Sequence, residues 1–475
     1  MVTEMAAPRR ASRNEQRTIS REDLGLYHAV IVGATYDIDS LLDVNSIESF
    51  YGPLQYCLDQ NPYLSVSIRD KGNDQSYYET VSDIDLSRHI HILDSSSTDE
   101  RDASSTIRHQ IKANLDRPFQ PDIPPWRLTA TRVRSNKVFI ALHFSHALGD
   151  GTFGVSFHQD LLRALSRNTS ESGKASQLYR VRDKPLPPPF DTNNTLPISW
   201  SCLLNTILTP ALPLSVASYL DPTTCTPDTW TGSPTRISPI PPSNLHLFTI
   251  PGPVLTGALQ AARAHNAKLT ALLAHLIARA LTHLLPPNPN RTFTSQVPLN
   301  LRPAAGLPPS TPGNCVSVTT LLHRIPVLPS SSPSQPLSEP EWSAIRTATS
   351  HLAARAGTLD GQPVALLRYV SSVRDWVRQQ ASRDPSSSFE VSNIGALVAE
   401  GRDGGVPVDD VVFAQPGMVG GPPLAFGFVS VRGGAMGGSV TWRKGALGVE
   451  GGEEGEGAFV ERVCDVLVRE LGMMR

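Results

Sequence analysis

The sequence has few cysteines, and their positions do not suggest a metal site. The 475 residues include five cysteines, an odd number, and these are scattered along the chain: Cys57, Cys202, Cys225, Cys315 and Cys464. None forms a CxxC pair or a Cys/His cluster with the spacing of zinc ligands, which argues against both a disulfide framework and a structural zinc site. We therefore expect no metal and no tightly bound cofactor.

Charge is also scarce. Charged residues make up 18% of the chain, below the ~25% that is usual for globular domains. Lys and Arg number 42 and Asp and Glu 44, which gives a net charge of −2. A general nucleic-acid or anionic-membrane binder needs a basic excess, so this balance argues against both. It also favours, weakly, an uncharged acceptor if the protein is an enzyme.

Several catalytic signatures are missing. The sequence contains no GxSxG elbow, no P-loop, no GxGxxG and no HExxH, so serine-hydrolase, nucleotide, dinucleotide and zincin functions lack support. The first residues have no apolar stretch of the kind found in secretory signals. We expect residues 1–19 to be a disordered polar tail and the protein to be cytoplasmic.

Strand and helix patterns alternate in both halves of the chain, which predicts a mixed α/β (α+β) protein with two lobes, residues 20–185 and 245–475. A strand is expected at 408–414 in the second lobe. Proline-rich residues 186–244 form a linker and crossover segment. Within it, residues 197–220 carry no charge, which leaves three alternatives: a membrane span, a lipid-touching segment, or a buried crossover helix. We favour the buried crossover helix, because three prolines and several Ser, Thr and Asn residues argue against a membrane span.

The most informative segment is the sequence HFSHALGDG at residues 143–151. The apolar run 137–145 predicts a strand buried on both faces, and residues 152–167 predict an amphipathic helix. The turn between them contains His146, whose ordinary pKa near ~6.5 suits a general base, so activity should fall below about pH 6–7. Asp150 can hold the turn by pairing with a cation or by capping backbone donors, and Gly151 permits a close turn.

Two other histidines lie near this turn. His143 is within the strand and is expected to be a hydrogen-bonded core residue. His158 falls on the following helix, where we expect it at the surface. His146 is therefore the predicted catalytic residue.

The segment SHALGDG resembles the HxxxDG motif of the CoA-dependent acyltransferase superfamily, which includes chloramphenicol acetyltransferase, plant acyltransferases, condensation domains and fungal alcohol acetyltransferases. LDRPFQPDIPPWRL before the motif, and KLTALLAHLIARAL, VPLNLRP and VSNIG after it, resemble further landmarks of the superfamily. TWTGSP and the short length are most similar to the fungal alcohol-acetyltransferase branch. The plant-type DFGWG is absent, and Ser145 replaces the first histidine that condensation domains usually carry.

The resemblance implies two chloramphenicol-acetyltransferase-like lobes in a V around a central substrate tunnel. It implies that His146 is the general base and that Asp150 points away from the substrate toward an arginine, for which Arg302 is the first candidate and Arg127 the second. Ser392 and Asn393 could stabilise the oxyanion, or they could simply form a turn before Gly395.

Three functions remain open. The first is acyl-CoA-dependent O-acyltransfer, with acetyl-CoA or another acyl-CoA as co-substrate and an alcohol or secondary metabolite as acceptor. The second is a standalone condensation-type enzyme that takes its acyl group from a carrier-protein thioester and forms an ester or amide. The third is a non-catalytic relative that binds a ligand in the tunnel. We expect a monomer that binds no nucleic acid, with a weak lipid contact through 197–220 left open.

Overall fold

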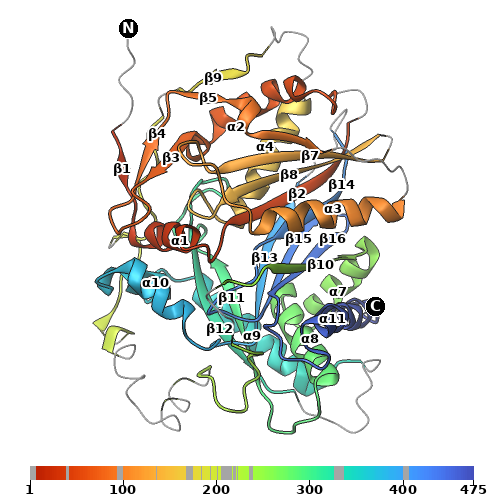
Figure 1. The fold of residues 1–475 in the computed structure, drawn as a ribbon. Helices are drawn as coiled ribbons and strands as arrows, with labels where there is room; N and C mark the ends of the chain where they lie inside the picture. Colours follow the sequence, from red (N-terminus) through yellow and green to blue (C-terminus); the bar gives the residue numbers. More distant parts are fainter. Residues whose placement is uncertain are drawn as a thin grey trace.

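The computed structural model describes most of the chain. The described residues are 7–38, 42–93, 100–134, 136–166, 175–182, 184–192, 194–200, 202–204, 217, 221, 223–234, 239–325, 336–398 and 406–474. Two large sheets, one for each lobe, organise this part of the protein (Figure 1).

The strands of the first half are β1 (Arg9–Arg10), β2 (Ala29–Asp37), β3 (Val66–Arg69), β4 (Tyr77–Thr80), β5 (Asp83–Asp85), β6 (Ile90–Leu93), β7 (Trp126–Arg134), β8 (Lys137–Ser145) and β9 (Leu178–Arg180). Those of the second half are β10 (Ser243–Ile250), β11 (Phe293–Asn300), β12 (Val316–His323), β13 (Phe389–Leu397), β14 (Val408–Ala414), β15 (Leu424–Val431) and β16 (Met436–Arg443).

The α-helices are α1 (Arg13–Asp23), α2 (Tyr51–Gln60), α3 (Glu100–Leu115), α4 (Gly151–Ser166), α7 (Gly252–Ala264), α8 (Leu269–Leu284), α9 (Glu339–Ala356), α10 (Val373–Ala381) and α11 (Gly452–Gly472). Short 3₁₀ turns are η1 (Ile47–Phe50), η2 (Pro62–Ser65), η3 (Leu86–Arg88) and η5 (Pro363–Tyr369).

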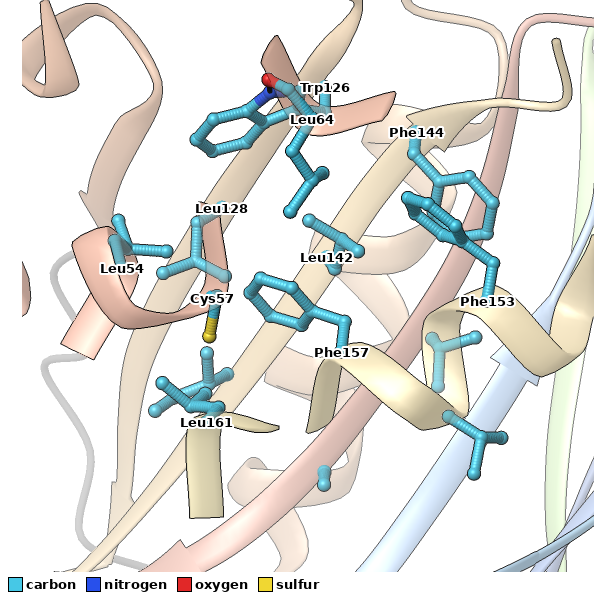
Figure 2. Packing of buried hydrophobic residues seen from close by; sticks show 14 of the residues in the cluster. Leu54, Cys57, Leu64, Trp126, Leu128, Leu142, Phe144, Phe153, Phe157 and Leu161 are labelled. Atoms are coloured by element: carbon cyan, nitrogen blue, oxygen red, sulfur yellow. Dashed lines mark hydrogen bonds between the residues drawn. The ribbon is translucent and has the colours of Figure 1, made fainter. Parts of the chain in front are cut away.

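The first lobe is built around β8, the predicted buried strand. Its sheet has the order β14-β2-β8-β7-β6, and β8 pairs antiparallel with both β2 and β7. Because β8 is central, its alternate side chains are buried on the two faces of the sheet, which explains why its sequence is an almost unbroken apolar run. Helix α4 follows β8 and covers one face with a cluster of aromatic and aliphatic side chains (Figure 2).

The second lobe has a six-stranded sheet of order β10-β16-β15-β13-β11-β12. Helix α8 is buried along most of its length and packs against α9 and α11 (Figure 1). The apolar residues of these helices and of the sheet form a second core, separate from that of the first lobe.

One strand of the second half belongs to the first lobe. Residues 408–414 form β14, as expected, but β14 pairs antiparallel with β2, with Val412 opposite Gly33, at the edge of the first sheet. The expected boundary, with all of residues 245–475 in the second lobe, therefore needs correction. A pattern of alternating residues predicts a strand but contains no information about which sheet edge it will join.

The expectation of a disordered tail over residues 1–19 is wrong for its second part. Helix α1 begins at Arg13, and Ser12 and Glu15 form a reciprocal capping box at its start. Asp23, at the end of the helix, forms an ion pair of 2.6 Å with Arg374 of α10, which ties α1 to an element of the second half. The polar composition that suggested disorder instead supplies these caps and ion pairs.

Most of the uncharged stretch 197–220 lies outside the described residues, so the three alternatives for it stay open. Among the residues that the structure does describe, no helix has both the length and the apolarity that crossing a membrane requires.

The core below β8 gives a first prediction. Phe157 of α4 is buried, and Figure 2 shows it among Leu142, Cys57 and Leu161. Replacing Phe157 with Ala should lower the free energy of unfolding by about 3–5 kcal/mol, because a large cavity remains. Urea denaturation measures this change. The control is Leu178→Ala, because the side chain of Leu178 is 51% exposed. This variant should change the free energy of unfolding by less than about 0.5 kcal/mol. Equal losses in both variants would contradict the packing described.

Candidate active site

The turn between β8 and α4 is held by Asp150. Strand β8 ends at Ser145 and α4 begins at Gly151, so the turn is only a few residues long. Asp150 Oδ1 accepts hydrogen bonds from the backbone nitrogens of Thr152 (3.1 Å) and Phe153 (3.4 Å). These are donors of the first helical turn, so Asp150 caps α4 and sets the direction in which the helix leaves the turn.

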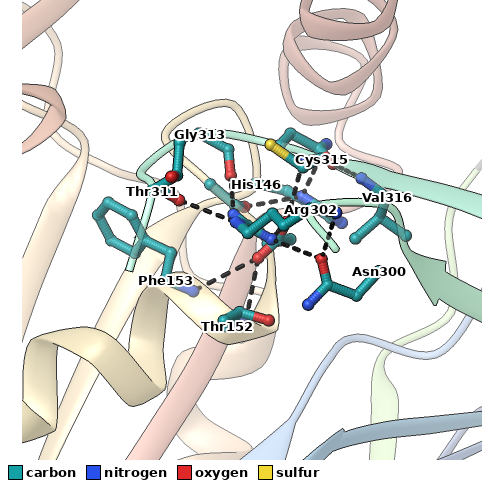
Figure 3. Close-up of polar contacts among 12 residues, drawn as sticks. His146, Thr152, Phe153, Asn300, Arg302, Thr311, Gly313, Cys315 and Val316 are labelled. Carbon is teal, nitrogen blue, oxygen red and sulfur yellow. Dashed lines mark hydrogen bonds and ion pairs between the residues drawn. The ribbon is translucent and has the colours of Figure 1, made fainter. Parts of the chain in front are cut away.

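The second carboxylate oxygen of Asp150 reaches the other lobe. Arg302 Nη1 donates to Asp150 Oδ2 at 2.8 Å, and the Cys315 backbone nitrogen donates to the same oxygen at 3.0 Å (Figure 3). The remaining donors of Arg302 bind the carbonyls of Thr311 and Gly313. Asp150 therefore pairs with Arg302 and ties the motif turn to the segment between β11 and β12.

This ion pair is almost completely buried, with Arg302 0% and Asp150 1% exposed. Burial acts to lower the pKa of Arg302, but the nearby Asp150 carboxylate raises it, and the net pKa lies above its ordinary value. Each charge is thus compensated by its partner and by backbone groups, which is the condition under which a buried ion pair can persist.

Gly151 lies where the two lobes are in close contact. A Cβ at this position would lie 2.3 Å from Ile394 Cγ2 of β13. A side chain at that distance requires Ile394 to move, so the glycine of the motif permits the close approach of the two lobes. The same contact brings the VSNIG segment, residues 391–395, next to the turn.

His146 is held in one tautomer. Its Nδ1 lies 2.9 Å from the carbonyl oxygen of Gly149, which can only accept a hydrogen bond, so Nδ1 carries the proton. The lone pair of a neutral imidazole is then on Nε2. The amide nitrogen of Asn314, from the other lobe, lies farther from Nδ1, at 3.4 Å, and because an amide nitrogen only donates, it forms no hydrogen bond with Nδ1 in this tautomer. The ring is only partly exposed.

The surroundings lower the basicity of His146. Burial, followed by the positive charges of Arg17 and Arg21, lowers the pKa of His146 to about 4. The imidazole is therefore neutral at pH 7. The expectation that activity falls at pH 6–7 assumed an ordinary histidine, and the lowered pKa instead predicts that the loss begins at a lower pH.

Residues that the sequence analysis missed form one side of the site. The Tyr27 ring lies 5.7 Å from that of His146, and its hydroxyl donates to Gln415 Oε1 at 2.9 Å. Gln415 Nε2 in turn donates to Glu390 at 2.6 Å. No sequence signal links these residues, because they come from three separate regions of the chain and meet only in the fold.

The other predicted residues lie in different environments. Arg127, the alternative partner for Asp150, donates instead to the carbonyls of Arg117 and Pro118. Asn393 turns toward α8, where its Nδ2 donates to Thr270 at 3.3 Å, and its Oδ1 accepts from the Gly395 nitrogen.

Ser392 differs from its neighbour Asn393. Its side chain is mostly buried and forms no hydrogen bond with any residue that the structure describes. Its neighbours Val391 and Asn393 face α8, so the side chain of Ser392, which precedes the irregularity in β13 after Asn393, faces the other side of the strand, toward the first lobe.

The two neighbouring histidines are both core residues. His143 is fully buried and is paired with Thr129 at 2.7 Å, as expected of a core histidine. His158 was expected at the surface, but it is also fully buried, and its Nε2 donates to the Val32 carbonyl at 2.8 Å. The expectation failed because α4 packs against β2, β13 and α2, so that more than one face of the helix is covered.

Removing the charge of Asp150 gives a second prediction. In Asp150→Asn the buried guanidinium of Arg302 keeps its charge without a counterion, which should cost about 3 kcal/mol of unfolding free energy and lower turnover. Urea denaturation and an activity assay measure the two effects, while binding of the acyl donor should persist. The control is Asp375→Asn, which removes an exposed pair with Arg378 and should cost under about 1 kcal/mol. A loss no larger than that of the control would show that the buried pair does not hold the turn.

Two known proteins resemble the chain in sequence, although no family model matches it. The chain is 24% identical over 415 residues to a probable alcohol acetyltransferase, crmB, of Aspergillus fumigatus. This match covers 83% of each sequence. It is also 23% identical over 434 residues to an uncharacterised protein of Schizosaccharomyces pombe, and this match covers 90% of each sequence.

Within the described residues, no group of three or more potential ligands could hold a metal ion.

Solved structures resemble the whole chain. The TRI3 trichothecene 15-O-acetyltransferase of Fusarium sporotrichioides superposes with a TM-score of 0.69 at 14% identity, covering 98% of this chain and 95% of that one. The starter condensation domain of rhizomide synthetase, in complex with C8-CoA, has a TM-score of 0.60 at 11% identity over 98% and 94%. The condensation enzyme VibH has a TM-score of 0.52 at 15% identity over 97% and 96%. This chain therefore has the two-lobed α/β fold that the TRI3 acetyltransferase shares with condensation domains, and the fold predicted from the sequence resemblance is confirmed.

Proposed function

We propose that the protein transfers an acyl group, acetyl in the simplest case, from coenzyme A to a hydroxyl of a small molecule, with His146 as the general base. The observation that carries this proposal is the fixed tautomer of His146. Its Nδ1 proton is held by the Gly149 carbonyl, so a neutral Nε2 is available to accept a proton. The relatives named as an alcohol acetyltransferase and a 15-O-acetyltransferase favour an oxygen acceptor, and the condensation domain solved with C8-CoA favours an acyl-CoA donor.

In the proposed reaction, Nε2 of His146 takes the proton of the acceptor hydroxyl as its oxygen attacks the thioester carbonyl. The tetrahedral intermediate then collapses, the carbon–sulfur bond breaks, and the imidazolium returns its proton to the departing sulfur. Because the pKa of His146 is lowered to about 4, the imidazolium is a strong acid and gives up its proton readily. A thioester is already activated, so no covalent enzyme intermediate is needed.

The oxyanion requires a hydrogen-bond donor. Of the two predicted candidates, Ser392 fits this role better, since its hydroxyl lacks a partner among the described residues and lies on the face of β13 that meets the motif turn. The amide of Asn393 is already bound to Thr270 and Gly395 on the other side of the strand.

Replacing His146 with Ala tests the proposal directly. The variant should lose a factor of about 10²–10⁴ in kcat and keep its KM for the acyl donor, because the base acts mainly in the transition state. The assay mixes acetyl-CoA with a panel of alcohols and follows release of the free thiol. Asp375→Asn serves again as a folded control with full activity. A His146→Ala protein with near-native transfer would leave orientation alone to explain catalysis.

The pH profile provides a separate test. The folded pKa of His146 is lowered, so the ring stays neutral as the pH falls and becomes protonated only near pH 4. The acidic limb of kcat/KM should therefore lie near pH 4–5, provided the fold is intact at that pH, which circular dichroism checks. A limb at pH 6–7 would show that His146 is solvated like an ordinary histidine.

A further inference from the structure

Two arginines of α1 lie on the same side of the active site. Arg17 and Arg21 are four residues apart, so both project from one face of the helix. The guanidinium carbon of Arg21 lies 4.4 Å from the centre of the Tyr27 ring, which itself lies 5.7 Å from the ring of His146. Both arginines remain partly exposed, although they are surrounded by protein.

Neither guanidinium is paired with a carboxylate in the part of the chain that the structure describes. Arg17 donates through Nε and Nη2 to the amide oxygen of Asn14, at 3.1 and 3.0 Å, and Arg21 contacts the sulfur of Met418 at 3.3 Å. These partners are neutral. Burial lowers the pKa of Arg17 to about 10 and also lowers that of Arg21, so the surroundings do not fully compensate either charge.

Two carboxylates lie nearby, but each has another partner. Glu390 is buried and accepts from Gln415 Nε2 at 2.6 Å; burial raises its pKa, which disfavours the ionised form. Asp191 accepts from the backbone nitrogen of Asn14 at 2.9 Å, at the start of α1. Neither forms an ion pair with Arg17 or Arg21, whose remaining donors are free to bind a ligand.

We propose that Arg17 and Arg21 form a carboxylate-binding subsite beside His146, so that one of the two substrates carries a carboxylate close to the reacting atoms. This inference rests on the proposed acyl transfer and specifies its substrate class. Guanidinium groups bind carboxylates through paired, charge-assisted hydrogen bonds. The overall composition weakly favoured an uncharged acceptor. The two positive charges beside His146 favour a substrate with a carboxylate instead.

A bound carboxylate has a consequence for the base. Arg17 and Arg21 both act to lower the pKa of His146, and an anion beside them offsets that effect. His146 therefore becomes a stronger base when the charged substrate is in place, which couples recognition of the substrate to proton transfer.

The carboxylate can belong to the acceptor or to the acyl group, and the experiment separates these sources. One arm compares mandelate with methyl mandelate as acceptor for acetyl-CoA. The other compares succinyl-CoA with butyryl-CoA as donor to a neutral alcohol. Binding of each compound is also measured by calorimetry, so that the result does not depend on turnover. The proteins are the full chain, Arg17→Met, Arg21→Met, the double variant, and the control Arg13→Met on the same helix.

The full chain should favour the carboxylate in one arm, in binding and in kcat/KM. The arginine variants should lose this preference by on the order of tenfold to a hundredfold, whereas the neutral compounds should bind as before. Loss of either arginine also raises the pKa of His146, so the effect on kcat/KM is read as the ratio of the charged to the neutral compound in each variant. Arg13→Met should behave like the full chain. Absence of any preference for a carboxylate in both arms, or an equal loss on neutral and charged compounds, would overturn the subsite. If the protein binds the carboxylates through these arginines but transfers no acyl group, the proposed function fails while the subsite stands.

Discussion

The buried ion pair between Asp150 and Arg302 is the interaction on which the site depends. One carboxylate oxygen caps α4, and the other receives both the guanidinium and the Cys315 nitrogen from the opposite lobe. A charge without a partner in this buried position would be costly, so neither residue can be lost alone without disturbing the turn. The position of His146 relative to the second lobe thus follows from the pairing of two residues that do not themselves react.

Other contacts make the same connection between the lobes. Strand β14 leaves the second half of the chain and completes the sheet of the first lobe, and α1 is held to α10 by the Asp23–Arg374 pair. At Gly151 the lobes approach so closely that a single added carbon would meet Ile394. Together these contacts place β13, with Ser392, beside the motif turn. The candidate active site is therefore formed by residues of both lobes.

The surroundings of His146 act on its basicity in two opposite ways. The Gly149 carbonyl fixes the tautomer and leaves Nε2 basic, whereas burial and the charges of Arg17 and Arg21 weaken that basicity. In the proposed role as base, a histidine of this kind stays neutral over a wide pH range and releases its proton easily after transfer. The arginines also connect α1, an element that the composition of the N-terminus did not suggest, with the chemistry of the motif.

The sequence by itself determined the local elements of the site. The apolar run 137–145 became β8 with the same limits, α4 begins within one residue of its predicted start, and Asp150 pairs with the first of the two arginines considered. These features follow from periodicity and from a compact motif, which depend on neighbouring residues. Only the tertiary structure decided that β14 joins the first sheet, that His158 is buried, and that Arg17, Arg21 and Tyr27 lie near His146. Those outcomes depend on contacts between distant segments, and the burial that shifts a pKa exists only once those segments have packed together.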